Sequence, residues 1–263
     1  MPNYNINLSH IPERSERPRT KGLTMVMDKG ISLRHAEDFV ESYGDYVDFV
    51  KLGFGTSVVS KNVKEKIKLY QKAGIKTYLG GTLFEAFVAR GKFDEYQKFI
   101  ESYGLDTAEV SDGSINMEHE SKCKYINLLS KNFTVLSEVG SKEEGIIIHP
   151  AKWTTMMKAE LEAGSFKVIA EARESGTVGI FHKNGSAHSM LISRITSKIN
   201  VDDIIWETPQ KSQQVYFINL FGANVNVGNI SVDDVIPLET LRIGLRGDTF
   251  FNYLPEDTKD KIF

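Results

Sequence analysis

The sequence predicts an α/β protein built as one (β/α)8 barrel. Eight short apolar runs alternate with segments whose apolar residues recur at helical spacing, at roughly 20 to 36 residues per unit. No linker rich in Gly, Ser or Pro divides the series. Polar residues close nearly every run, as expected at the rim of a parallel barrel. A doubly wound open sheet is the structural alternative, but such a sheet normally places its site at one switch point.

The expected strands are apolar runs that stop at a polar or Gly-containing turn. They cover residues 23–27, 46–52, 76–79, 105–110, 134–139, a sixth run from 167, then 203–207 and 224–227. In the sixth run, alternation places Glu171 and Arg173 on one face of the strand. Because an acid and a guanidinium are costly to desolvate at the end of a buried strand, their presence there favours a functional role.

The helices between these strands are predicted by apolar spacing and by end signals. Ser32 has the chemistry of a helix N-cap, and Gly74 and Gly164 follow the last periodic residues of two other segments. The expected helices cover about 33–43, 61–73, 83–91, 93–103, 116–131, 153–163, 210–221 and 233–243. Residues 179–197 predict a loop or small hairpin with a helix.

Residues 1–20 are expected to form an N-terminal arm, and residues 21–263 the barrel. The arm region carries Arg14, Arg17, Arg19 and Lys21 without an apolar signal core. These charges favour a solvated arm. The functional alternative is an arm that reaches a partner subunit or covers the site.

Composition narrows the function classes. The chain has 263 residues, a formal net charge of −3 and a hydrophobic content of 41%, so charge alone does not point to nucleic acid or to an anionic membrane. Aromatic and basic residues do not interleave into a stacking stripe, and no apolar run is long enough to span a bilayer. The single cysteine, Cys123, excludes an internal disulfide and a multi-cysteine zinc site, and fits a reduced cytoplasmic setting. An apolar helix at 83–88 favours a homo-oligomer.

The polar residues at the strand ends predict a site, because parallel strands of a barrel present their carboxyl ends at one rim. Lys51, Lys142 and Arg173 suit an anionic ligand, and a guanidinium can hold a carboxylate or phosphate through two hydrogen bonds. The acids at the strand ends exceed the need of an anion site and suit a hard cation such as Mg²⁺. These candidate metal ligands are Asp28, Glu109, Glu138, Glu171 and Glu207.

Three Gly-containing corners, at 53–57, 80–82 and 228–230, precede helical segments and offer backbone N–H groups to a phosphate. None has the spacing of a P-loop or a dinucleotide fingerprint, and the histidines show no zinc spacing. Lys51 or Lys142 as a Schiff-base amine is a chemical alternative. The candidate substrate-binding residues are Lys29, Gly55, Thr56, Ser57, Gly81, Thr82, Ser111, Asn226, Gly228 and Asn229.

Several motifs resemble the phosphosulfolactate synthase family. They are the stretches at 51–57 (KLGFGTS), 80–85 (GGTLFE), 138–140 (EVG), 161–164 (LEAG), 171–176 (EARESG), 205–207 (IWE) and 245–249 (LRGDT). The likeness runs in order from about residue 17 to 248. It implies a Mg²⁺-dependent barrel enzyme that adds sulfite to phosphoenolpyruvate and yields (2R)-3-phosphosulfolactate, a reaction of coenzyme M biosynthesis.

Residue chemistry then suggests roles within that reaction. We expect Lys142 to be the general acid, with Lys51 as second choice, and Arg173 to orient the substrate carboxylate or phosphate. Glu138, Glu171 and Glu207 are the leading metal candidates. Some family members are implicated in plant heat tolerance, so a stress-related or interaction protein on the same barrel is the alternative function.

Overall fold

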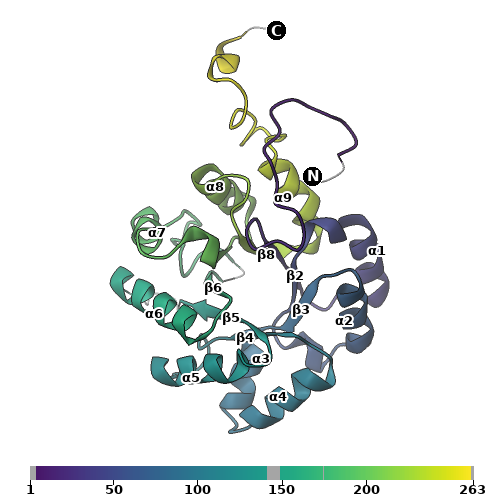
Figure 1. Cartoon of the computed structure of the whole chain (residues 1–263), viewed down its shortest axis with the longest axis vertical. Helices are drawn as coiled ribbons and strands as arrows, with labels where there is room; N and C mark the ends of the chain where they lie inside the picture. Colours follow the sequence, from purple (N-terminus) through teal and green to yellow (C-terminus); the bar gives the residue numbers. More distant parts are fainter. Residues whose placement is uncertain (1–3, 141–148, 174, 262–263) are drawn as a thin grey trace.

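The computed structural model describes residues 4–140, 149–173 and 175–261, and its centre is one eight-stranded sheet (Figure 1). The strand order is β3-β2-β1-β8-β7-β6-β5-β4, and all paired neighbours are parallel. The two end strands, β3 and β4, lie beside each other, so the ring is nearly closed. The predicted (β/α)8 barrel is confirmed, and the open-sheet alternative is wrong. The strands are β1 (Thr24–Asp28), β2 (Phe49–Leu52), β3 (Lys76–Leu79), β4 (Thr107–Val110), β5 (Thr134–Val139), β6 (Lys167–Ala170), β7 (Ile204–Glu207) and β8 (Val227–Ser231).

Helices surround the strands (Figure 1). The Ser32 hydroxyl accepts a hydrogen bond from the His35 N–H, which confirms the predicted N-cap. The segment of uncertain prediction contains an antiparallel bridge between Phe181 and Ala187, followed by a helix. The α-helices are α1 (Leu33–Tyr43), α2 (Val63–Lys72), α3 (Gly81–Val88), α4 (Phe93–Ser102), α5 (His119–Leu129), α6 (Pro150–Ala163), α7 (Ser189–Thr196), α8 (Lys211–Phe221) and α9 (Val235–Arg242). Short 3₁₀ turns are η1 (Gly44–Tyr46), η2 (Thr56–Val58), η3 (Val201–Asp203), η4 (Val232–Asp234) and η5 (Glu256–Asp260).

Alternation along the strands separates two cores. Residues that point outward pack against the helices in two large clusters. Residues that point inward fill the lower part of the barrel and leave the carboxyl ends of the strands for polar side chains. The inner core consists of Leu23, Met25, Phe49, Tyr78, Leu136, Ile169 and Ile205.

The N-terminal arm packs on the opposite end of the barrel, where the strands begin. Arg14 is 2% exposed and bonds the Glu239 carboxylate through Nε at 2.8 Å. Arg17 donates to the carbonyls of Gly44 and Gly74, in the loops that precede β2 and β3. The expectation of a solvated arm is therefore wrong for these arginines, because they satisfy carbonyls and carboxylates at the N-terminal ends of the strands.

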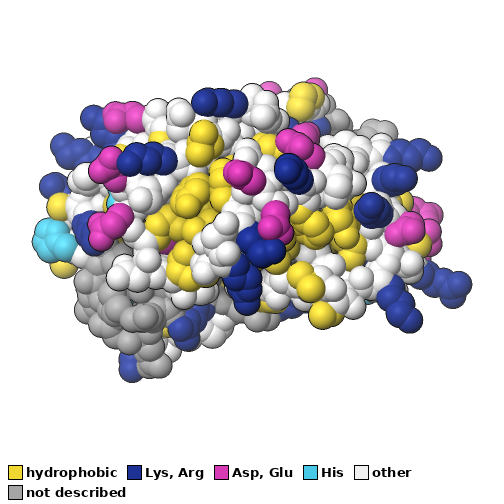
Figure 2. Space-filling view, turned by 90° about the horizontal axis from the view of Figure 1, so that it is seen from below, with side chains coloured by type: hydrophobic (Ala, Val, Ile, Leu, Met, Phe, Trp, Pro, Cys, Tyr) yellow, Lys and Arg dark blue, Asp and Glu magenta, His cyan; other side chains and the backbone are white. Residues whose placement is uncertain are grey.

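The side of the barrel in Figure 2 carries Lys, Arg, Asp and Glu side chains of both signs, with hydrophobic side chains between them. This mixture agrees with the small formal net charge. Among the helices of the described ranges, none has both the length and the apolar character needed to cross a bilayer.

Candidate active site

A cavity of about 360 Å³ opens at the carboxyl ends of the strands. Its size lies within the usual range of small-molecule sites. Nine of the predicted site residues border it: Lys51, Gly81, Thr82, Glu109, Glu138, Glu171, Arg173, Glu207 and Asn229. The rim thus brings together residues from most of the barrel, as the position of the strand ends predicted.

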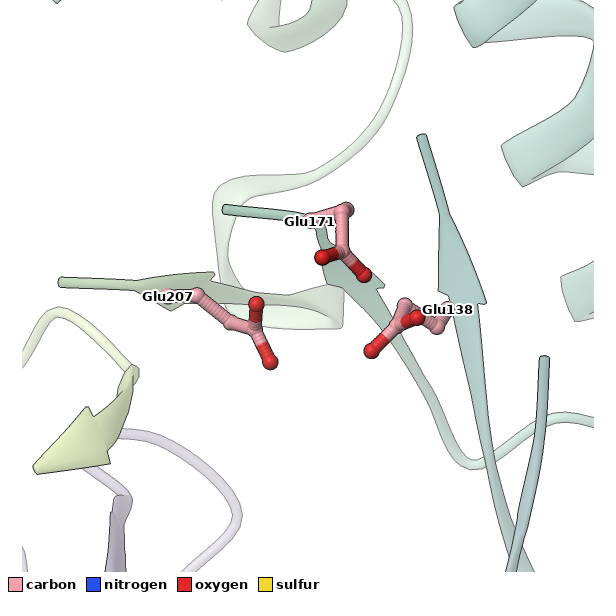
Figure 3. A group of neighbouring side chains, drawn as sticks. All are labelled: Glu138, Glu171 and Glu207. Carbon is pink, nitrogen blue, oxygen red and sulfur yellow. The ribbon is translucent and has the colours of Figure 1, made fainter. Parts of the chain in front are cut away.

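Three glutamates from neighbouring strands share one side of this cavity. Glu138 is the second-last residue of β5, Glu171 directly follows β6, and Glu207 is the last residue of β7. All three are buried, and one carboxylate oxygen from each lies within 4.8 Å of the others. Figure 3 shows their carboxylates turned toward a common point. Carboxylate oxygens are the ligands that a hard divalent cation such as Mg²⁺ prefers, so these three residues could hold one.

Lys51 faces the glutamates from β2. Its Nζ lies 2.9 Å from Glu109 Oε2, 3.5 Å from Glu138 Oε2 and 3.6 Å from Glu207 Oε1. Burial by itself favours the neutral amine, but the three carboxylates outweigh it and raise the pKa of Lys51 well above its usual value. The side chain is therefore a fixed ammonium ion at the floor of the cavity.

The buried carboxylates around Lys51 outnumber the positive charges near them, so their ionised forms are disfavoured. Burial raises the pKa of Glu207 to about 8, Lys51 opposes the shift, and the charge of Glu138 adds to it. Burial also raises the pKa of Glu109, again against the influence of Lys51. Such a cluster holds protons at neutral pH that a divalent cation would displace.

Glu109 is held by the turn that opens α3. Its Oε1 accepts a hydrogen bond of 2.6 Å from the Gly81 N–H, while its Oε2 faces Lys51. A Cβ at Gly81 would collide with the Ser111 hydroxyl and lie 2.8 Å from Glu109 Oε1, so only glycine allows this approach. We expected Glu109 among the metal ligands; the structure instead makes it the partner of Lys51, outside the three-glutamate group.

Asp28 does not join the cavity, which corrects its prediction as a metal ligand. Its Oδ2 lies 2.7 Å from Lys66 Nζ and accepts a 3.0 Å hydrogen bond from the Tyr70 hydroxyl, both on α2. Its Oδ1 accepts two backbone N–H groups of the following turn. Alternation explains the error, because Met27 borders the cavity and the next residue must point outward.

Asn226 was predicted as a substrate-binding residue at a strand end, and this placement is wrong. β8 begins one residue later, at Val227, so Asn226 lies at the N-terminal end of the barrel. Its Oδ1 accepts the Leu23 N–H, and its Nδ2 donates to the carbonyls of Asp202 and Ile204. The alternation of Asn and Val residues from Asn224 to Val227 reads like a strand and hid the true start of β8.

Other predicted residues lie near the rim without bordering the cavity as the structure describes it. Ser111 is buried and donates to the Glu85 carboxylate. Gly228 sits inside β8, where a Cβ would be 2.6 Å from Met25 Cε. The remaining ones are Lys29, Gly55, Thr56 and Ser57, which belong to the turns after β1 and β2. Lys142, the predicted general acid, lies outside the described residues.

Arg173 and Asn229 form the upper edge of the cavity. Arg173 is exposed, and within the described residues its guanidinium forms no ion pair. Asn229 has a φ of 56°, a conformation that Asn tolerates better than most residues, and its Nδ2 donates to the Ala172 carbonyl at 3.4 Å. An available guanidinium and a buried ammonium that border the same cavity suit an anion with two charged ends.

Five residues that border the cavity are not among the predicted site residues, although two of them, Phe54 and Gly80, lie in the predicted Gly-containing corners. The five are Met27, Phe54, Gly80, Ala172 and Ser175. Alternation could have found Met27, since it sits between inward-pointing Met25 and the strand end. Phe54 lies in the predicted corner at 53–57, but nothing in the sequence singled out its side chain. It is 51% exposed, and its φ of 55° is unusual for an aromatic residue.

Fold and site together define a barrel enzyme with a buried cluster of acids and a basic anion site. A family model described as (2R)-phospho-3-sulfolactate synthase (ComA) matches residues 12–248. The phosphosulfolactate synthase of Methanothermobacter thermautotrophicus is 43% identical over 244 residues, covering 90% of this chain and 95% of that protein. That of Bacillus subtilis is 40% identical, covering 92% and 97%. The chain belongs to the phosphosulfolactate synthase family of carbon–sulfur lyases.

Solved structures agree on the fold. The 3-hexulose-6-phosphate synthase of Salmonella typhimurium superposes with a TM-score of 0.56 at 13% identity, covering 85% of this chain and all of that one. At this identity the likeness concerns the barrel alone.

Proposed function

We propose that this enzyme adds sulfite to phosphoenolpyruvate in a Mg²⁺-dependent reaction that yields (2R)-3-phosphosulfolactate. The observation that carries the proposal is the convergence of Glu138, Glu171 and Glu207 opposite Lys51 in one cavity, with Arg173 at its edge. Family membership supplies the reaction, and the site supplies groups of the required charge.

The substrate would lie between the two basic side chains. Arg173 would hold its carboxylate or phosphate through paired hydrogen bonds, and Lys51 would face the other end from the cavity floor. Sulfite attacks the methylene carbon and forms the C–S bond, while the electrons of the double bond move toward the carboxylate. A proton delivered to the adjacent carbon completes the product.

Glu138, Glu171 and Glu207 would hold the cation. When bound, Mg²⁺ supplies positive charge beside the carboxylate where negative charge develops. The proton donor is Lys142 in our proposal, with Lys51 as second choice. Because Lys51 is held as a strong ammonium by its carboxylates, it can donate hydrogen bonds to the substrate more readily than it can release a proton.

The same charge argues against Lys51 as a Schiff-base amine, since that chemistry begins from the neutral form. The buried charges also favour an enzyme over an interaction protein. Groups such as Glu207 and Lys51 are costly to keep away from water, and a surface that only docks a partner does not need them there. Cytoplasmic location and homo-oligomer formation remain predictions.

The test is direct assay. Purified protein is incubated with phosphoenolpyruvate, sulfite and Mg²⁺, and the sulfonate product is followed by mass spectrometry. Absence of product with and without Mg²⁺ would reject the proposal. Lys142→Ala is compared with Lys124→Ala, an exposed lysine on α5; full rate in the first variant would reject Lys142 as the acid. A borohydride-trapped substrate adduct would point to Schiff-base chemistry instead.

A further inference from the structure

Tyr78 lies directly beside the site without bordering the cavity. It is a β3 residue paired in register with Lys51 of β2, and both side chains point into the barrel. Its ring meets Phe49 edge-on, with centroids 6.3 Å apart, and the residue is 0% exposed. The phenol oxygen is buried, and no hydrogen bond to it is formed by any residue in the described ranges.

A buried hydroxyl without a partner is unfavourable, and phenylalanine would fill the same apolar space without that penalty. The hydroxyl is also under the influence of the site's charges. Burial first, and then the charge of Glu109, raise the pKa of Tyr78 well above its usual value, so the group keeps its proton. A protonated phenol can both donate and accept a hydrogen bond.

Lys51 will need a new partner when a cation binds. Its Nζ contacts Glu109 at 2.9 Å but depends on Glu138 and Glu207 at 3.5 and 3.6 Å for its other charge contacts. A divalent cation on those two glutamates takes their charge and repels the ammonium. Lys51 would then keep Glu109, and the residue paired with it on the neighbouring strand is Tyr78, whose hydroxyl has no other partner among the described residues.

We propose that Tyr78 is a positioning residue whose hydroxyl accepts from Lys51 and donates to Glu109 when the glutamates hold their cation. The inference rests on the cation site of the proposed function and adds a residue that belongs to neither the cation ligands nor the cavity lining.

The test compares Tyr78→Phe with Tyr96→Phe. Tyr96 is also 0% exposed and also has a buried hydroxyl without a partner among the described residues, but it lies in the outer core, packed against Phe84. Thermal unfolding is measured without metal and across a Mg²⁺ titration, with no substrate present. We expect Tyr78→Phe to unfold at the wild-type temperature or above it without metal, and to bind Mg²⁺ about tenfold more weakly, the effect of losing one hydrogen bond to a charged group. Tyr96→Phe should keep the wild-type Mg²⁺ affinity.

Three results would overturn the inference, and they are distinguishable. Wild-type Mg²⁺ affinity in Tyr78→Phe would reject the role of Tyr78 and leave the cation site intact. A large loss of metal-free stability in Tyr78→Phe would show that the hydroxyl is already bonded. No Mg²⁺ response in the wild-type protein would reject the cation site and the role of Tyr78 together.

Discussion

Protons and the cation should compete for Glu207, and this competition can be measured without substrate. The pKa of this carboxyl is raised to about 8 by burial first, with the charge of Glu138 adding to the shift against the opposing effect of Lys51. A cation binds the ionised carboxylate, so its binding must release the proton that Glu207 holds at neutral pH. Mg²⁺ affinity is therefore expected to rise with pH.

The magnitude follows from the fraction of Glu207 that is ionised. With a pKa of about 8, roughly one tenth of the carboxyl is ionised at pH 7 and roughly nine tenths at pH 9. The apparent Mg²⁺ affinity should therefore increase about tenfold between these two pH values, which corresponds to about 1.4 kcal/mol of binding free energy. A site made of carboxylates with ordinary pKa values would show almost no change over this range.

Isothermal titration calorimetry at pH 7 and pH 9 measures this difference, and buffers of different ionisation enthalpy reveal the released proton. Glu207→Gln, which removes both the charge and the proton, should bind Mg²⁺ at least about tenfold more weakly at pH 9 and lose most of the pH dependence. Glu120→Gln, at an exposed carboxylate on α5, is the matched control and should behave as wild type. Equal wild-type affinity at the two pH values would refute the competition, and unchanged binding by Glu207→Gln would refute the ligand assignment.

Three further outcomes are expected. The pKa of Glu207 is raised from 4.5 to about 8 in the folded state, so the protonated carboxyl stabilises the metal-free protein at low pH, and this stability should be lost as pH rises from about 5 to about 8. A thermal unfolding temperature that does not fall across this pH window would contradict the prediction. Asp28→Asn should lower the free energy of unfolding by about 3 kcal/mol, because Lys66 would stay buried without its carboxylate; an unchanged denaturation midpoint would count against that. Arg173→Lys should raise the KM for phosphoenolpyruvate about tenfold with a smaller change in kcat, since a lysine cannot form the paired hydrogen bonds; steady-state kinetics with an unchanged KM would remove Arg173 from substrate binding.

Local sequence patterns predict much of the barrel, and the errors in the predicted strand limits also come from local patterns. The limits of β5, whose run of apolar residues ends at Val139, were predicted as the structure has them. The start of β8 was predicted three residues too early, because Asn224 to Val227 alternates polar and apolar residues as a strand would, although the strand begins at Val227. Periodicity cannot tell such a segment from the strand that follows it.

Contacts between residues far apart in the sequence are a second feature that local patterns do not predict. Arg14 appears in the sequence as one charge in a basic arm, yet its carboxylate partner, Glu239, lies 225 positions away. A buried ion pair of this kind depends on the meeting of the chain's beginning with its last helix. Composition and spacing carry no information about that meeting.

The sequence by itself determined that the chain is a (β/α)8 barrel and that acids and bases gather at one rim, because each parallel βα unit presents its strand end on the same side. Only the tertiary structure decided which of those residues converge in the cavity and which pair elsewhere. Barrel closure aims Glu138, Glu171 and Glu207 at one point, whereas strand alternation turns Asp28 outward to Lys66. The register of β2 and β3 sets Tyr78 beside Lys51. Charge separations of a few ångströms decide which groups share protons or a cation, and those separations exist only once distant strands have closed into a ring.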